Sequence, residues 1–264
     1  MQPGQQQAKA SSSTPDLLRV LSLNIQVGLR SSQYRHYLTQ AWRHLLPSRG
    51  VRGVLDEIGA LATGYDLVAL QEADAGSLRT RQLNQVAYLA ERAALPHWQA
   101  AVNRDLRPFA QHCLGVMSRD PLKVLRHHAL PGLLPGRGAL DVEVSRPGYR
   151  PLRMVVVHLA LGRRDRHRQL GYLGALLEDG DDALVLGDFN CEPQELDAHP
   201  SLRRAGLKPV HRQLTYPAWA PTRCIDHVLA TEGLEVQAAC VLGARLSDHL
   251  PVGLSLRLRR EETS

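Results

Sequence analysis

Short apolar runs and amphipathic segments alternate along most of the chain. Apolar runs of strand length, bounded by polar or turn-forming residues, predict strands at 17–25, 66–71, 153–162, 182–190, 224–230, 234–240 and 252–258. Shorter apolar pieces punctuated by glycine and proline predict further strands near 98–102, 113–118, 122–128 and 139–145. Apolar residues at helical spacing predict helices at 34–46, 51–62, 82–93 and 164–178. This mixture of elements predicts an α/β or α+β layered fold.

The domain organisation follows from where this pattern begins and from the lack of interruptions. No linker-like stretch divides the elements, so we expect one domain over residues 17–264, preceded by a disordered, polar tail over residues 1–16. The 264 residues with 44% apolar content suffice for a sizeable core. The tail lacks the apolar segment of a secretory signal, and no apolar run reaches the roughly 18 residues of a transmembrane helix.

Charge and cysteine content narrow the class of protein further. The net charge of +6 and the pI of about 9.4 favour polyanionic partners such as nucleic acid, anionic lipid or phosphate esters, without choosing among them. The four cysteines are scattered and form no CxxC pair, which argues against a zinc knuckle or a redox motif. Reduced thiols predict a cytoplasmic protein, and nothing in the sequence indicates an obligate protein partner.

Polar side chains recur where the expected strands end. They are carboxylates, amides and imidazoles, namely Asn24, Glu72, His158, Asp188, Asn190, Asp226, Asp248 and His249. Each has an ordinary alternative, since Asn24 could be a turn residue and His158 a hydrogen-bonded core histidine. Strand ends often carry catalytic groups because a rigid sheet positions them. Oxygen ligands suit Mg²⁺ or Mn²⁺, whereas a zinc site would contain more histidine or cysteine.

The stretch ALVLGDFNCEP, residues 183–193, places two of these groups close together. Successive strand side chains point to opposite faces, so we expect Asp188 and Asn190 on one face and Phe189 on the core-facing side. The pair could be turn chemistry or the edge of a site for a metal or a phosphate.

The order of the polar blocks resembles one known family. The blocks LSLNIQ, LQEAD, VVHLALG, LGDFNCEP, CIDHVLA and LSDHLPV are similar to the motifs of the endonuclease/exonuclease/phosphatase superfamily and span about residues 17 to 258. The resemblance implies a four-layer sandwich, in which two packed mixed β-sheets are flanked by helices. It also implies a metal-dependent hydrolase of phosphate esters that works by direct attack of water.

By position, the resemblance implies a metal set. Asn24 and Glu72 would help to hold a catalytic Mg²⁺ or Mn²⁺, with Glu72 the principal ligand and Asp248 a further carboxylate. A divalent cation would offset the negative charge of a phosphodiester and of its transition state.

The same resemblance implies an acid–base set. His249 would be the general base, oriented by Asp226, because a carboxylate on one ring nitrogen fixes the tautomer. Asp188 and Asn190 would position the attacking water and the scissile phosphate, and His158 would bind a phosphate oxygen or assist the leaving group. One departure stands out, because Cys113 and Leu114 occupy the place where many members carry a Gly-Asn pair.

The substrate is less constrained than the reaction. Arg163 and Arg164, in the basic stretch GRRDRHRQ, could grip a phosphate backbone or could be the solvated start of a helix. A nuclease acting on DNA or RNA is the leading hypothesis. A sphingomyelinase-like phospholipid hydrolase or a small phosphate-ester phosphatase is the alternative. LPGLLPG (130–136) could then be an apolar loop that touches a membrane, although we expect a buried turn there. An inactive binding module is a third hypothesis, against which the intact His249, Asp226 and Glu72 argue.

Overall fold

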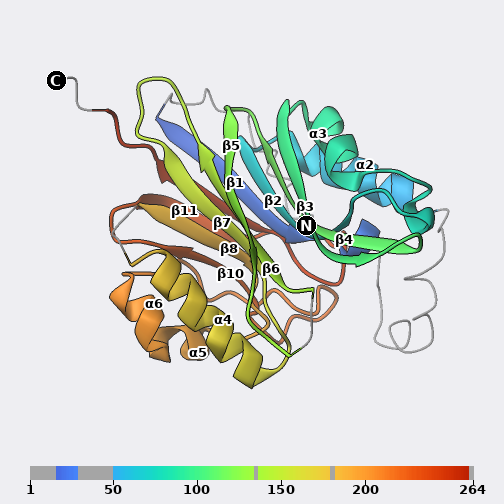
Figure 1. Ribbon diagram of the computed structural model, residues 1–264. Coiled ribbons are helices and arrows are strands. Elements are labelled where there is room, and N and C mark those ends of the chain that lie inside the picture. Colours follow the sequence, from blue (N-terminus) through green and yellow to red (C-terminus); the bar gives the residue numbers. More distant parts are fainter. Residues whose placement is uncertain (1–15, 29–49, 134–135, 179–181, 262–264) are drawn as a thin grey trace, which may run out of the picture.

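The computed structural model describes residues 16–28, 50–133, 136–178 and 182–261, and its centre is a pair of six-stranded β-sheets (Figure 1). The order of the first, sheet A, is β11-β12-β1-β2-β4-β3, and the order of the second, sheet B, is β5-β6-β7-β8-β10-β9. Both sheets are mixed, because β1 runs parallel to β2 and β7 runs parallel to β8 while the other pairings are antiparallel. The fold class predicted from the sequence is therefore confirmed.

Sheet A gathers strands from both ends of the described chain. Its strands are β1 (Leu17–Asn24), β2 (Leu67–Asp74), β3 (His97–Leu106), β4 (Ala110–Ser118), β11 (Glu235–Val241) and β12 (Val252–Arg257). Sheet B is built from the middle of the chain. Its strands are β5 (Leu122–Ala129), β6 (Gly138–Val144), β7 (Leu152–His158), β8 (Ala183–Asp188), β9 (Lys208–Pro209) and β10 (Asp226–Ala230).

Helices cover the outer face of each sheet, which gives four layers (Figure 1). Helices α2 (Val51–Ala62) and α3 (Gln85–Ala93) share one apolar cluster with sheet A. Helices α4 (Arg163–Leu176), α5 (Pro193–Ala198) and α6 (Pro200–Arg204) share another with sheet B. Two 3₁₀ turns, η1 (Gln26–Gly28) and η3 (Leu78–Thr80), follow β1 and β2. A third cluster fills the space between the sheets and includes residues of both.

The alternation of side chains along each strand decides which residues reach the space between the sheets. In β1, Leu18 and Val20 belong to the inter-sheet cluster, and Leu21 and Leu23 face the helices. In β8, Leu184 and Leu186 face the other sheet, while Ala183 and Val185 face the helices, as does Phe189 directly after the strand. A two-residue period continued past these apolar positions brings Asn24 and Asp188 onto the inter-sheet face at the strand ends.

Most predicted elements appear within a few residues of their expected bounds. The helix expected at 164–178 is α4, and the strand expected at 153–162 ends at His158. The sequence pattern missed α5, α6 and β9, which are too short to show a period. The helix expected at 34–46 and nearly all of the expected tail lie outside the described residues. One domain over residues 17–264 stays a prediction.

Two further expectations concern membranes and thiols. Among the helices of the described segments, none is long and apolar enough to cross a membrane. All four cysteines are free, with Cys113, Cys191 and Cys224 buried and Cys240 exposed. Cytoplasmic localisation stays a prediction.

Candidate active site

Polar side chains replace apolar ones at one end of the space between the sheets. On sheet B, Asp188 pairs in register with His158 of β7 on one side and with Asp226 of β10 on the other. Val156, Leu186 and Val228 of these strands belong to the inter-sheet cluster, so the side chains two residues along point into the same space. Three consecutive strands therefore place an imidazole and two carboxylates side by side.

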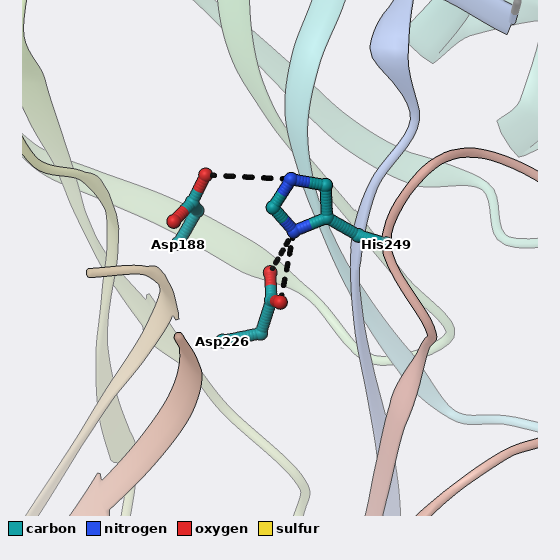
Figure 2. Close-up of side chains that lie close together, drawn as sticks. All are labelled: Asp188, Asp226 and His249. Carbon is teal, nitrogen blue, oxygen red and sulfur yellow. Dashed lines mark hydrogen bonds and ion pairs between the residues drawn. The ribbon is translucent and has the colours of Figure 1, made fainter. Parts of the chain in front are cut away.

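His249 joins this row from the loop before β12, and Asp226 holds it (Figure 2). The Nδ1 of His249 lies 2.9 Å from Oδ1 and 2.8 Å from Oδ2 of Asp226. Nδ1–H therefore donates to Asp226, and Nε2 is directed toward Asp188, whose Oδ2 lies 3.9 Å away. The dyad can orient an imidazole whose free nitrogen accepts a proton.

Glu72 reaches the same space because of a β-bulge. Leu70 pairs with Gly115 and Ala73 with Cys113, so two residues of β2 oppose one residue of β4. Leu70 and Ala73 both face the helices; without the extra residue, Glu72 would also face them. The bulge, with Glu72 at φ 56, turns its carboxylate to the inter-sheet side, where it lies 3.8 Å from Nε2 of His158.

Asp188 is the hub of the site. Its Oδ2 accepts a hydrogen bond from Nδ2 of Asn24 at 3.2 Å, which links the ends of sheets A and B. The same oxygen lies 3.5 Å from Nε2 of His158. Gly187 makes this position attainable, because at φ 141 it packs directly on the carbonyl of Val157, where a Cβ would overlap. The backbone thus requires a glycine directly before Asp188.

The DFN segment after β8 is both a turn and part of the site. Oδ1 of Asp188 accepts a hydrogen bond from the backbone N–H of Asn190 at 3.0 Å, which is an Asx turn. Phe189 is fully buried among the residues that face α4, as expected. The side-chain amide of Asn190 donates to the carbonyl of Leu159 at 3.0 Å. Asn190 therefore fixes the end of β7 relative to the end of β8.

Oxygen donors that could hold a divalent cation come from sheet A and its loops. Asn24 ends β1, Glu72 lies at the bulge of β2, and Asp248 precedes β12. Asp248 is buried, and its Oδ1 has no hydrogen-bond partner within the described part of the chain. Burying a carboxylate oxygen without a hydrogen-bond partner costs free energy. A bound cation would supply a partner for this oxygen. Asp188, Asp226 and His249 also place ligand atoms within 4.8 Å of one another, but Asp226 already holds His249.

The carboxylates of the site make it strongly negative. Burial raises the pKa of Asp188 to about 7, with Asp226 and Glu72 adding to the rise and His249 opposing it. Burial raises the pKa of Asp248 to about 6, with Glu72 adding to it. Although burial lowers the pKa of His249, Asp226 and Asp188 raise it to about 10, so its imidazole is protonated at pH 7. A cation that offsets the charge of the carboxylates would lower this pKa and leave Nε2 free to accept a proton. A site with this much negative charge is suited to a cation.

His158 behaves differently from His249. Burial lowers the pKa of His158 to about 3, although Glu72 opposes the change. Its imidazole is therefore neutral at pH 7 and can donate one N–H to a phosphate oxygen without carrying charge. Burial also raises the pKa of Glu72, but His158, His249 and a hydrogen bond from Asn24 outweigh it and lower that pKa below its ordinary value.

A cavity of about 360 Å³ opens beside Glu72 and His158. Besides His158, three basic residues line it, namely Arg104, His112 and Arg137. The sequence alone did not indicate His112 or Arg137 as site residues. The signal that could have found Arg137 is its setting between two glycines in GRG, at the start of β6. His112 gave no such signal, because it precedes the expected strand 113–118.

Arg163 and Arg164 lie outside the cavity beside Glu72 and His158. They are exposed in the first turn of α4 and line a separate hollow of about 970 Å³, together with Glu192 and Glu195. Neither lines the 360 Å³ cavity, although Gly162 and Asp165 of the same helix start do. Their role in substrate binding stays a prediction.

Cys113 and Leu114, which stand where the resembling motifs carry a Gly-Asn pair, lie in different surroundings. Cys113 lines the cavity, and burial raises the pKa of its thiol to about 12, so it is protonated at neutral pH and unsuited to be a nucleophile. Leu114 is buried between the sheets, opposite the bulge that carries Glu72.

The arrangement can be compared with known proteins. The model of the Endonuclease/Exonuclease/phosphatase family matches residues 21–249. No curated protein sequence matches the chain significantly.

Solved structures share the fold. An endonuclease/exonuclease/phosphatase from Beutenbergia cavernae is 24% identical, with a TM-score of 0.72 over 92% of this chain and 72% of that one. A mannosyl-6-phosphatase from Bacteroides thetaiotaomicron is 16% identical, with a TM-score of 0.63 over 90% of this chain and 99% of that one. A humanized TDP2 from D. rerio is 19% identical, with a TM-score of 0.63 over 92% and 99%.

The family match covers every block that carries a site residue, from Asn24 to His249, and the solved structures share the two-sheet architecture that brings these residues together. The chain therefore belongs to the endonuclease/exonuclease/phosphatase family of hydrolases acting on phosphate esters.

Proposed function

We propose that this protein is a Mg²⁺- or Mn²⁺-dependent phosphodiesterase that hydrolyses nucleic acid by direct attack of water. The observation that carries the proposal is the buried Asp226–His249 dyad, whose free Nε2 is directed at Asp188. Once a cation offsets the neighbouring carboxylates, such a dyad supplies a proton acceptor. The thiol of Cys113, which lines the cavity, is protonated, and this supports water as the nucleophile.

The cation would be held by the oxygens of Glu72, Asn24 and Asp248. The orphaned, buried Oδ1 of Asp248 and the excess of carboxylates support this set. When bound, a divalent cation neutralises charge on the phosphate and stabilises the charge that develops on it. The donors are all oxygens, which favours Mg²⁺ or Mn²⁺ over zinc.

The side chains of the site have separate roles in proton transfer and in positioning water and phosphate. His249 takes a proton from water at Nε2 as the water oxygen bonds to phosphorus and the ester P–O bond breaks. Asp226 holds the tautomer at Nδ1 and stabilises the imidazolium. Asp188, fixed by Asn24 and by the N–H of Asn190, orients the water. Neutral His158 donates an N–H to a phosphate oxygen or to the leaving group.

The role of His249 can be tested with a generic bis-aryl phosphodiester. Replacing His249→Ala removes the proton acceptor, and we expect kcat to fall roughly 100- to 10,000-fold in Mg²⁺ or Mn²⁺. The matched control is His127→Ala, because His127 is an exposed histidine of β5 that should tolerate the change. Hydrolysis that survives His249→Ala at the native rate would contradict the assignment.

The substrate class requires a side-by-side panel. Plasmid DNA, abasic duplex, RNA, sphingomyelin vesicles and inositol phosphates, each with Mg²⁺ or Mn²⁺, would rank the candidates. The proposal expects cleavage of DNA or RNA to be fastest. Activity on vesicles with inert nucleic acid would overturn it, and no activity on any ester would favour the inactive binding module.

A phospholipid hydrolase is the second candidate, and one observation favours it. Leu133 is 83% exposed and Leu161 is 75% exposed, and Leu161 lines the cavity. The backbone N–H of Leu133 donates to Asp165, another residue of the cavity lining, at 3.1 Å. The expectation of a buried turn at 130–136 is wrong for Leu133. In a phospholipid hydrolase, these two exposed leucines beside the cavity would contact the lipid surface.

A further inference from the structure

Two arginines line the same cavity as Glu72 and His158 without belonging to the catalytic row. Arg104 is near the end of β3, and Arg137 immediately precedes β6. Among the described residues, neither guanidinium has a hydrogen bond or an ion pair with another side chain, whereas Arg79 and Arg107 are paired with Asp74 and Asp105. The charge of these two arginines is thus left without a partner carboxylate in direct contact.

The backbone around Arg137 is shaped to hold the two arginines together. A Cβ on Gly136 would lie 3.0 Å from Cβ of Arg104, and a Cβ on Gly138 would lie 3.1 Å from Oδ1 of Asn103. Gly136 is at φ 102, which favours glycine. The stem of Arg104 therefore packs directly on the backbone beside Arg137. The two glycines of GRG permit this close approach.

The electrostatics of the arginine pair favour the binding of an anion. Burial lowers the pKa of Arg137, Asp188 and Glu72 raise it, and Arg104 lowers it again. The guanidinium of Arg137 is therefore attracted by the carboxylates of Asp188 and Glu72 and repelled by Arg104. His112 adds no charge, because burial lowers its pKa to about 4 and its Nε2 lies 3.3 Å from Nη1 of Arg79. An anion between the two guanidiniums would relieve the repulsion.

Asp165 also lines the cavity, and its carboxylate would repel an anion. Its Oδ1 is buried without a hydrogen-bond partner in the described segments, with Arg168 3.6 Å away. A negatively charged group that enters the cavity is therefore attracted to Arg104 and Arg137 rather than to Asp165. At about 360 Å³ the cavity is near the lower limit of ligand pockets, with room for one nucleoside-sized or polyol-sized unit.

We propose that Arg104 and Arg137 form a subsite for a second phosphate of the substrate, one unit away from the phosphate that is hydrolysed. This inference rests on the proposed function, because it takes the site formed by Glu72, Asp188 and His249 as the place of hydrolysis. Nucleic acid carries such a neighbouring phosphate, and so do polyols with several phosphates. The shared chemistry is a phosphate ester with a second, nearby phosphate.

A pair of chromogenic substrates tests the subsite. The p-nitrophenyl ester of thymidine 5′-phosphate is compared with the same ester that carries an added 3′-phosphate, in Mg²⁺. In the native protein we expect the second phosphate to raise kcat/KM by roughly tenfold or more, as for charged hydrogen bonds. In Arg137→Gln and Arg104→Gln the ratio of the two kcat/KM values should approach one. Arg137→Lys, which keeps the charge, should retain part of the increase in kcat/KM that the second phosphate causes.

Arg203→Gln is the matched control, because Arg203 is an exposed arginine of α6 and the ratio should stay at its native value. A native ratio near one would overturn the subsite while leaving the proposed function intact. Absence of hydrolysis of both esters would count against the proposed function instead.

A binding measurement tests the subsite when neither ester is hydrolysed. Calorimetry should give a roughly tenfold lower Kd for thymidine 3′,5′-bisphosphate than for thymidine 5′-phosphate, and the difference should vanish in Arg137→Gln. The same comparison of inositol 1,4-bisphosphate with inositol 1-phosphate distinguishes the two sources. Equal Kd values within both pairs would overturn the subsite. Unchanged Tm values of the variants would show that they are folded.

Discussion

At the scale of single residues, Gly187 has the least freedom in the site. Its φ is 141, and a Cβ would overlap the carbonyl oxygen of Val157 on the neighbouring strand. Because Gly187 immediately precedes Asp188, any shift that makes room for a side chain also moves the hub of the site. We expect Gly187→Ala to lower the free energy of unfolding by about 3 kcal/mol or more and to reduce activity. Urea unfolding and the diesterase assay measure the two effects.

A second glycine provides the control for Gly187→Ala. Gly53 lies inside α2, where a Cβ would meet nothing within 4 Å. Alanine is the better helix former, so Gly53→Ala should raise stability by up to about 1 kcal/mol and leave activity unchanged. A Gly187→Ala protein as stable and active as the native one would contradict the close packing of β7 against β8.

Strand periodicity accounts for which site residues the sequence could reveal. Asn24, His158, Asp188 and Asp226 continue the two-residue pattern of apolar positions that face the other sheet. The sequence pattern is therefore enough to place them on one face. Glu72 breaks this pattern, because only the bulge in β2 brings it to that face. A bulge depends on pairing with another strand, which local sequence does not specify.

Arg137 illustrates the same limit for binding residues. It lines the cavity where Arg104 of β3 packs on Gly136, in the loop before β6. This contact joins a strand of sheet A to a loop that leads into sheet B. No local pattern specifies such a contact, and the glycines on either side are a hint only once the neighbour is known.

At the scale of elements, Asp66 joins three strands of sheet A at the end away from the site. It immediately precedes β2 and accepts hydrogen bonds from the backbone N–H of Arg19 in β1 at 2.9 Å and from Nε of Arg119 after β4 at 3.4 Å. Although burial raises the pKa of Asp66, the hydrogen bonds from Arg19 lower it below its ordinary value. The carboxylate is thus stabilised in its ionised form.

A pH dependence of stability follows from Asp66. Since its folded pKa is below its unfolded one, its stabilising effect is present above the unfolded pKa of about 4 and is lost as the pH falls through the folded pKa. Asp66→Asn should cost about 1–2 kcal/mol at pH 7, because both arginines are partly exposed. The cost should shrink below about pH 4. Urea unfolding at several pH values measures both.

Asp56→Asn is the control for this pH series. Asp56 is a half-exposed carboxylate on α2, 3.2 Å from Arg92, and an exposed pair contributes about 0–1 kcal/mol. Its pH profile should match that of the native protein. A profile of Asp66→Asn that also matches the native one would contradict the ion-paired role of Asp66.

The elements that the sequence predicted are those with a complete period. Helix α2 matches its expected bounds because Val54, Leu55 and Ile58 repeat at helical spacing and pack on sheet A. Helices α5 and α6 have six and five residues, each with a proline in its first turn. Such short helices show no repeat, and they are stabilised by packing on α4 and sheet B rather than by their own pattern.

At the scale of the whole molecule, the two sheets divide the chemistry. The oxygen donors Asn24, Glu72 and Asp248 belong to sheet A and its loops, and His158, Asp188 and Asp226 belong to sheet B. The hydrogen bond between Asn24 and Asp188 joins the two groups. In the proposed mechanism, relative displacement of the sheets would separate the cation from the attacking water, so the apolar packing between the sheets would also set the geometry of catalysis.

Cation binding should therefore stabilise the whole fold. A cation that binds only the folded protein should add about 2.7 kcal/mol at a concentration about 100 times its Kd, seen as a higher Tm with Mg²⁺ or Mn²⁺ and a return to the starting value with EDTA. Asp248→Asn should lose most of this shift, because it removes the charge of the orphaned carboxylate. Asp197→Asn, an exposed acid on α5, should keep the shift. An undiminished shift in Asp248→Asn would place the cation elsewhere, because the site would then not need that carboxylate.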